Sequence, residues 1–317
     1  MGNALRKNGN AVRDEHNGRR RRRIPVQDPP TTPTKYGTKY ILAGRSRNGG
    51  IKYPLPVNVE EKNMWLEDQH YFIRHLWQSN FSSPVGEILK TGGANVLDIG
   101  CGNGTWLLEM AKDFPESKFV GVDIAPLFPT NHGLENLEFR LNNLLEGLPF
   151  EDNTFDLVFA RLVGDTFSER EWEETVLREL GRLIKPGGFL EIMQTDSELF
   201  SVGKNSEIWN KALLAMNMNN SICEKFENWL LKLLKEKQFS NISHEVVISP
   251  IGTWANKTGE FGVAYIRHLS SQMKPQIINQ LNINETEYDR LVEMMEQEYN
   301  EFSTYRKSHR FIAQKNY

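Results

Sequence analysis

The sequence has few cysteines, no long apolar run and no overall excess of basic residues. Only Cys101 and Cys223 occur among 317 residues, far apart and without metal-ligand spacing, so we expect neither a disulfide framework nor a metal site. No apolar run approaches the roughly 20 residues that span a membrane, and no N-terminal apolar segment indicates a secretory signal. The formal net charge of −3 argues against nucleic acid as a partner. These absences favour a cytoplasmic or nuclear protein without membrane contact.

Residues 1–34 differ from the rest of the chain. They combine Gly, Asn and Pro with five consecutive arginines, Arg19 to Arg23, and contain few large apolar residues, which predicts a disordered basic tail. Three interpretations of the arginine run stay open: a solvated tail without a role, a nuclear-import or nucleic-acid patch, and a membrane-surface anchor. Arg6 stands where a myristoylation signal has Ser or Thr, so we do not expect lipidation.

Residues 35–317 alternate between strand-like and helix-like segments and predict a single domain. Strands are expected at 96–99, 118–124, 137–141, 155–162, 189–193, 244–249 and 309–315, and helices at 58–78, 83–89, 105–114, 168–183, 224–237, about 257–273 and 285–299. Ser83-Pro84 offers an N-cap for one helix, and Ser168 with Glu171 forms a capping box for another. This alternation predicts an α/β fold: a doubly wound, mostly parallel sheet with helices on both faces and an antiparallel closing strand.

The stretch "VLDIGCGNGTW", residues 96–106, holds the clearest functional signal. Gly100, Gly102 and Gly104 follow an apolar strand, so bare backbone can turn tightly and approach a ligand at the carboxyl edge of the sheet. Asp98 precedes the loop, and Asp123 ends the next strand, where a carboxylate can accept hydrogen bonds from ribose hydroxyls. The spacing G-x-G-x-G differs from the dinucleotide pattern G-x-G-x-x-G, which disfavours a nicotinamide-dependent oxidoreductase and indicates a nucleoside without a pyrophosphate.

Four motifs in order, "VLDIGCGNGTW", "FVGVDIAP", "LEGLPFEDNTFDLVFAR" and "LIKPGGFLEI", resemble those of the class I S-adenosylmethionine-dependent methyltransferases. The resemblance covers residues 92–193 and implies a Rossmann-like fold with S-adenosyl-L-methionine as cofactor. The flanking "YPLP" and "QH", with His70, resemble fungal methyltransferases related to trans-aconitate methyltransferase and to regulators of secondary metabolism.

The resemblance also implies a role for particular residues. Asp98 and the loop Gly100, Cys101, Gly102, Asn103 and Gly104 would hold the methionine part; Asp123 would bind the ribose, Ile124, Asn143 and Leu144 would contact the adenine, and Ala160 and Arg161 would lie beside the methyl donor. The family usually has an acid at position 143 and the subgroup one at Gln194, so both contacts would be altered here.

Structural interpretations compete with these roles. Asp98 would then cap the following helix, Asp123 would belong to a turn, Arg161 would pair with a surface carboxylate, and His70 would be an ordinary core or surface histidine.

The resemblance implies in-line methyl transfer to a small-molecule or protein acceptor. The sequence identifies no catalytic residue; Asp196, Glu198 and His70 are the candidate bases. Segments 58–78 and 250–300 would form a helical lid, with Trp254, Phe261 and Tyr265 available to a substrate pocket or to the core. The alternative function is a non-catalytic regulator that binds the cofactor, and the oligomeric state stays open.

Overall fold

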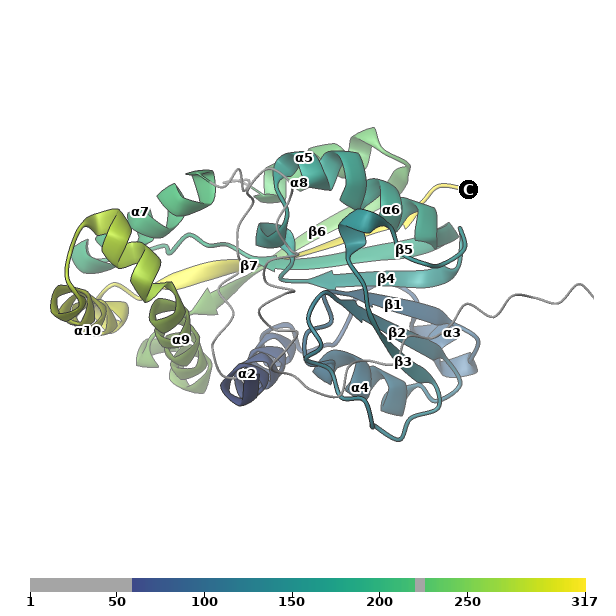
Figure 1. The fold of residues 1–317 in the computed structure, drawn as a ribbon, viewed down its shortest axis with the longest axis horizontal. Coiled ribbons are helices and arrows are strands. Elements are labelled where there is room, and N and C mark those ends of the chain that lie inside the picture. Colours follow the sequence, from purple (N-terminus) through teal and green to yellow (C-terminus); the bar gives the residue numbers. More distant parts are fainter. Residues whose placement is uncertain (1–58, 220–225) are drawn as a thin grey trace, which may run out of the picture.

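The computed structural model describes residues 59–219 and 226–317, which build a seven-stranded sheet flanked by helices (Figure 1). The strand order is β3-β2-β1-β4-β5-β7-β6. The strands are β1 (Asn95–Ile99), β2 (Lys118–Asp123), β3 (Leu137–Leu141), β4 (Phe155–Arg161), β5 (Ile184–Thr195), β6 (Phe239–Pro250) and β7 (Tyr305–Lys315). The first five are parallel, and β7 runs antiparallel between β5 and β6. The predicted doubly wound sheet and its antiparallel closing strand are confirmed.

One face of the sheet is covered by α2 (Val59–Trp77), α3 (Gly86–Thr91) and α4 (Thr105–Asp113) (Figure 1). Their apolar residues recur at helical spacing, as Trp106 and Met110 do on α4, and are buried against β1, β2 and β4. The Trp106 ring stacks on Phe159 of β4 at 4.1 Å between centroids. On the predicted helix at 58–78, Ile73 and Trp77 are buried in this layer and belong to the core.

The other face is covered by α5 (Glu169–Glu171), a π-helical turn η4 (Trp172–Val176), α6 (Leu177–Leu183) and α8 (Phe226–Glu236). The predicted capping box is present: the Ser168 side chain accepts from the Glu171 backbone N–H, and the Glu171 side chain accepts from the Ser168 backbone. Leu180 and Leu230 are fully buried in this layer. Helices therefore lie on both faces, as expected.

A third cluster of helices lies beyond the carboxyl ends of the parallel strands. It contains α7 (Lys204–Asn219), α9 (Asn256–Leu281) and α10 (Glu285–Glu301), with the short η5 (Thr253–Ala255) before α9. The Trp209 indole of α7 donates to the Tyr288 hydroxyl of α10 at 3.1 Å. Trp65 of α2 stacks on His268 of α9 at 4.7 Å, so the helices predicted as lid elements pack on each other.

Three local predictions were incomplete or wrong. Helix α7 was not expected, although Trp209, Leu213 and Met216 follow helical spacing. Ser83 is not the N-cap of α3: Val85 is, and the Ser83 hydroxyl instead donates to the buried carboxylate of Glu191 at 2.6 Å. Strand β5 begins at Ile184, so the Pro-Gly-Gly segment lies inside it, where its register with β4 shifts.

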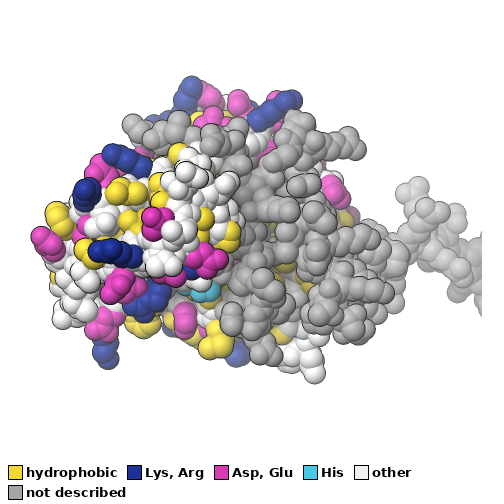
Figure 2. Space-filling model, turned by 60° about the vertical axis from the view of Figure 1, so that its left-hand side comes forward, with side chains coloured by type: hydrophobic (Ala, Val, Ile, Leu, Met, Phe, Trp, Pro, Cys, Tyr) yellow, Lys and Arg dark blue, Asp and Glu magenta, His cyan; other side chains and the backbone are white. Residues whose placement is uncertain are grey.

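The predicted tail, residues 1–34 with Arg19 to Arg23, lies outside the described residues. Among the helices that are described, none combines the length and the apolar character that a membrane crossing requires. In the coloured part of Figure 2, lysine and arginine side chains are interspersed with aspartate and glutamate, so the described residues there form no patch of a single charge.

Candidate functional site

The fold brings the predicted cofactor residues to one edge of the sheet. The glycine loop follows β1, Asp123 and Ile124 close β2, Asn143 and Leu144 follow β3, and Ala160 and Arg161 end β4. Because these four strands are parallel neighbours, their carboxyl ends meet, at the edge where ligands bind in open α/β sheets. Asp98 and Asp123 therefore lie on adjacent strands and share one site, as the predicted nucleoside site requires.

The glycine loop adopts a backbone that other residues rarely take. Gly100, Gly102 and Gly104 have φ values of 69°, 56° and 75°, in the left-handed region. A Cβ atom at Gly100 would lie 2.6 Å from Val163 Cγ1, so packing also excludes a side chain there. The backbone N–H groups of Gly100 and Cys101 donate to the Val122 carbonyl at 2.8 and 3.1 Å. These bonds fasten the loop to the end of β2.

Helix α2 lies directly over this loop. The Asn103 side chain donates to the Asn63 carbonyl at 3.1 Å. Leu66 Cδ1 would be 3.4 Å from a Cβ atom at Gly102. Helix α2, which lies in the segment predicted as a lid, therefore contacts the glycine loop.

Asp123 joins two loops through its carboxylate. One oxygen accepts from the Gly102 backbone N–H, and the other accepts from the Ala125 backbone N–H, each at 2.8 Å. The contact with Ala125 is the turn interaction expected of the structural interpretation, whereas the contact with Gly102 belongs to the ligand loop. These bonds orient the Asp123 carboxylate at the end of β2, beside the glycine loop.

Asp98 is a buried carboxyl, 4% exposed, in the middle of the sheet edge. Burial raises its pKa to about 8; the nearby Arg161 lowers the pKa and Asp123 raises it further. Asp98 does not cap the following helix, because the N-cap of α4 is Gly104 and no side chain caps it. Asp98 is therefore mostly protonated near pH 7, and it would have to lose this proton to pair with a cationic ligand group.

Arg161 is held by a chain of polar contacts that the sequence did not predict. Its guanidinium donates to His70 Nδ1 at 3.2 Å, and His70 Nε2 lies 2.9 Å from Glu109 Oε2. Because arginine can only donate, Nδ1 accepts and Nε2–H donates to the glutamate. Arg161 therefore does not simply pair with a surface carboxylate, and fully buried His70 holds it from behind.

The charges in this chain follow from burial. Burial, followed by the charge of Arg161, lowers the pKa of His70 to about 4, so the imidazole is neutral near pH 7. Burial also lowers the pKa of Arg161, to about 10, which leaves the guanidinium charged. The site thus presents one positive group beside Asp98.

The predicted adenine contacts lie at the far end of this edge. The Asn143 side chain accepts from the Leu145 backbone N–H at 3.1 Å and caps the short helix η2 (Leu144–Glu146). Its amide donates to Glu146 at 3.1 Å. One lone pair of the Asn143 carbonyl is therefore used locally, and a contact with adenine stays a prediction.

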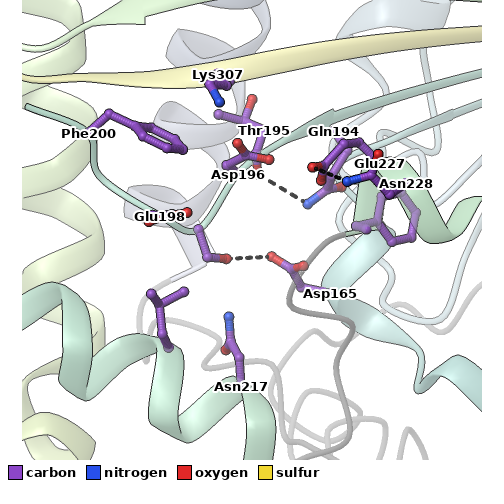
Figure 3. A pocket seen from close by; sticks show the side chains of 13 residues that line it. Asp165, Gln194, Thr195, Asp196, Glu198, Phe200, Asn217, Glu227, Asn228 and Lys307 are labelled. Atoms are coloured by element: carbon purple, nitrogen blue, oxygen red, sulfur yellow. Dashed lines mark hydrogen bonds between the residues drawn. The ribbon is translucent and has the colours of Figure 1, made fainter.

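A cavity of about 210 Å³ opens beside this site, at the carboxyl end of β5 (Figure 3). Gln194 Oε1 accepts from the Gly164 backbone N–H at 3.0 Å, which fixes η3 (Gly164–Thr166) against β5. The Ser197 hydroxyl donates to Asp165 Oδ2 at 3.1 Å. Among the described residues that line the cavity, one is basic, Lys307, and four are acidic: Asp165, Asp196, Glu198 and Glu227.

The candidate bases differ in whether they line this cavity. Asp196 and Glu198 line it, whereas His70 contacts Arg161 instead. The aromatic residues expected in a substrate pocket do not line this cavity: Trp254 and Phe261 are 41% and 47% exposed on the surface, and Tyr265 packs against Trp65. No local motif marks Asp165 or Glu227, because only the folded chain brings them together.

A family model described as a methyltransferase domain matches residues 90–309 of this chain. The chain belongs to the class I S-adenosylmethionine-dependent methyltransferases. It is 28% identical over 155 residues to the secondary metabolism regulator laeA of Coprinopsis cinerea, covering 48% of this chain and 38% of that protein. It is 30% identical over 165 residues to the N-methyltransferase verN of Clonostachys rogersoniana, covering 51% and 56%. The methyltransferase thus spans only part of the length of these relatives.

Among solved structures, a phosphoethanolamine N-methyltransferase 2 of Haemonchus contortus superposes with a TM-score of 0.46 at 19% identity, covering 83% of this chain and 61% of that one. S-adenosylmethionine is the cofactor of this methyltransferase. The residues at the sheet edge fit it. The loop is bare where a Cβ atom would clash, and Asp123 is oriented by two backbone N–H groups. Asp98, when ionised, would carry the charge opposite to that of Arg161.

Proposed function

We propose that this methyltransferase transfers a methyl group to a small-molecule or protein acceptor that enters the acidic cavity at the end of β5. The proposal rests on the position of this cavity next to the cofactor edge of the sheet. Arg161, at the cofactor edge of β4, pairs in register with Met193 of β5, and the Leu162 backbone N–H donates to the Met193 carbonyl at 2.8 Å. The cavity begins at the next residue, Gln194. Helix α2 and the helices α9 and α10 would form the lid.

The cofactor would be held by charge and by hydrogen bonds. Its methionine part is a zwitterion, and Asp98 and Arg161 offer one group for each charge: the carboxylate for the ammonium, the guanidinium for the carboxylate. Asp123 would accept from the ribose hydroxyls, and Ile124, Asn143 and Leu144 would contact the adenine. Ala160 is fully buried and leaves the end of β4 without bulk.

S-adenosylmethionine supplies a methyl group on a positively charged sulfur. The departing thioether is neutral and needs no proton, so the chain's main task is to align the acceptor, which can contribute on the order of 7 kcal/mol or more. An O–H or N–H acceptor must also lose a proton. The carboxylates of Asp196 and Glu198 face the cavity and can take it. Asp165 has a pKa raised by burial, which suits it to hold a proton there.

A second function, a regulator that binds the cofactor without turnover, is favoured by the name of the laeA relatives alone. Turnover separates the two. The purified chain would be incubated with methyl-labelled cofactor and pools of amines, carboxylic acids, phenols and proteins. Methyl transfer proportional to enzyme, and lost in Asp123→Ala, supports the enzyme. Cofactor binding without a labelled product from any pool would favour the regulator.

A further inference from the structure

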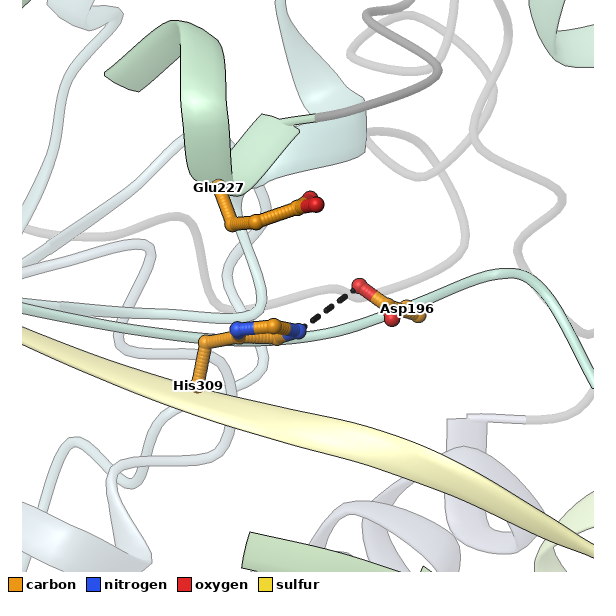
Figure 4. Close-up of side chains that lie close together, drawn as sticks. All are labelled: Asp196, Glu227 and His309. Carbon is orange, nitrogen blue, oxygen red and sulfur yellow. Dashed lines mark ion pairs between the residues drawn. The ribbon is translucent and has the colours of Figure 1, made fainter. Parts of the chain in front are cut away.

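At one end of the acidic cavity, three side chains from separate elements converge: Asp196 after β5, Glu227 in the first turn of α8 and His309 of β7 (Figure 4). One oxygen of each carboxylate and a ring nitrogen of the histidine all lie within 4.8 Å of one another. Residues so far apart in the sequence meet here only because β7 inserts beside β5 and α8 covers them.

The histidine is an unusual member of this group. His309 is 3% exposed, and its Nε2 atom makes no hydrogen bond in the described part of the chain. Asp196 Oδ1 lies 2.9 Å from Nε2, but this contact lacks hydrogen-bond geometry. A buried ring nitrogen that makes no hydrogen bond is costly, so Nε2 of His309 is an unsatisfied polar atom beside a carboxylate.

The other ring nitrogen defines which form His309 can take. His309 Nδ1 lies 2.9 Å from His244 Nε2, and the two rings stack. A neutral imidazole can donate or accept at either ring nitrogen, so the tautomer in which His309 Nδ1–H donates to His244 is available. In that tautomer the Nε2 atom of His309 carries a lone pair that can bind a cation shared with Asp196.

We propose that His309, Asp196 and Glu227 bind a divalent transition-metal ion at the wall of the acidic cavity. One imidazole nitrogen and two carboxylates are ligand types that Zn²⁺ accepts, and the two carboxylates also suit Mn²⁺. Three protein ligands leave a coordination position that can face the cavity. The imidazole of His244 is the outer partner that fixes the tautomer and ring orientation of a metal-ligating histidine.

Binding of Zn²⁺ would require only small movements of the three ligand side chains. In a tetrahedral Zn²⁺ site with ligands at about 2.0–2.1 Å, neighbouring ligand atoms are about 3.4 Å apart. Asp196 and His309 are already closer than this. Glu227 is half-buried and accepts a hydrogen bond from the exposed amide of Asn228 at 3.1 Å, so its carboxylate can move by the remaining distance of up to about 1.4 Å.

The surrounding charge supports a cation. Asp165 and Glu198 add two more acids to the lining of the cavity. The basic residue there, Lys307, has its ammonium over the Phe200 ring, 4.2 Å from the centroid. The site lies in the cavity assigned to the acceptor but is defined without the cofactor, so binding of the ion is measured independently of methyl transfer.

The test is a calorimetric titration of the untagged, chelator-treated full chain with Zn²⁺, Mn²⁺ and Mg²⁺, without cofactor. We expect one Zn²⁺ per chain, weaker binding of Mn²⁺ and the weakest of Mg²⁺. Glu227→Gln, at a half-buried position that the fold does not depend on, should weaken Zn²⁺ binding at least tenfold. Glu198→Gln removes the same charge from the same cavity and should change it less than about threefold. His244→Phe keeps a ring against Phe311, removes the outer hydrogen bond and should cost about 10–100-fold.

Two results would overturn the proposal. One is the absence of stoichiometric Zn²⁺ binding at about millimolar metal by a chain whose circular dichroism and cofactor binding are normal. The other is an equal loss in Glu198→Gln and Glu227→Gln, because that would mean that the acidic cavity collects cations without a defined site. Cofactor binding, measured in parallel, keeps a failure of this site distinct from a failure of the methyltransferase assignment.

Discussion

Binding of the cofactor should release a proton from Asp98. This carboxyl is 4% exposed and has a pKa of about 8, raised by burial, so below pH 7 the free protein holds it mostly protonated. The proposed contact with the ligand ammonium needs the carboxylate. Deprotonation must then accompany binding, and the affinity for S-adenosylhomocysteine should rise about tenfold per pH unit between pH 5.5 and 7.

Two neighbouring groups, His70 and Cys101, titrate outside this interval. The pKa of His70 is lowered to about 4, and that of the Cys101 thiol is raised further above 9.0 by burial. The ligand's α-amino group, with a pKa near 8 in model compounds, stays charged below pH 7. The change of affinity with pH therefore reports on the ionisation of Asp98. Asp98→Asn should abolish it and should weaken binding at pH 7 by at least tenfold.

The same substitution should stabilise the cofactor-free protein. The pKa of Asp98 is 3.8 in the reference state and about 8 when folded, so the unfolded chain ionises first. Stability should fall as the pH rises from about 4 to about 8, since the folded state binds the extra proton. At pH 7 this costs up to about 4 kcal/mol, at about 1.4 kcal/mol per unit, and Asp98→Asn removes it.

The assays are calorimetry at pH 5.5, 6.25 and 7, and thermal unfolding without ligand. Glu87→Gln, which removes an exposed acid on α3, is the matched control and should keep the wild-type slope. If the affinity of the wild-type protein does not change across this pH interval, Asp98 does not lose a proton on binding. The same conclusion would follow if the Asp98→Asn variant kept the pH dependence of the wild-type affinity.

Three further predictions concern the same edge. Asp123→Ala should weaken cofactor binding by about 1–3 kcal/mol, since ligand hydroxyls lose their acceptor; calorimetry showing full affinity would remove Asp123 from the site. Gly102→Val should abolish binding while circular dichroism shows the fold intact, because valine strains a φ of 56° and fills the ligand side; unchanged affinity would undo the loop assignment. His70→Ala leaves Arg161 and Glu109 without a buried partner and should lower the free energy of unfolding in urea by about 1–3 kcal/mol; equal stability would mean that this contact contributes nothing.

The glycine loop and both acids were predictable because their signals are local. An apolar strand, alternate glycines and an acid at the next strand end follow one another along the chain, and parallel pairing brings them to one edge. The polar chain behind Arg161 was not predictable. His70 lies 91 residues away in the sequence, and only the packing of α2 on α4 places it between Arg161 and Glu109.

The residues around the acceptor cavity were even harder to predict from the sequence. Asp165, Asp196 and Glu227 come from three connections with no shared motif, and α7, which helps to line the cavity, was missed despite its apolar spacing. Conversely, Trp254 and Phe261 have the composition of a pocket wall but lie exposed. Composition indicates that aromatic side chains are available, whereas the fold decides which of them meet a cavity.

A crystal structure of the chain with S-adenosylhomocysteine would test most directly whether the cofactor binds at the glycine loop. We expect the ribose hydroxyls within hydrogen-bond distance of Asp123 and the ligand's ammonium beside Asp98, with the sulfur facing the acidic cavity. A ligand bound away from the Gly100–Gly104 loop, or with its ribose far from Asp123, would contradict it.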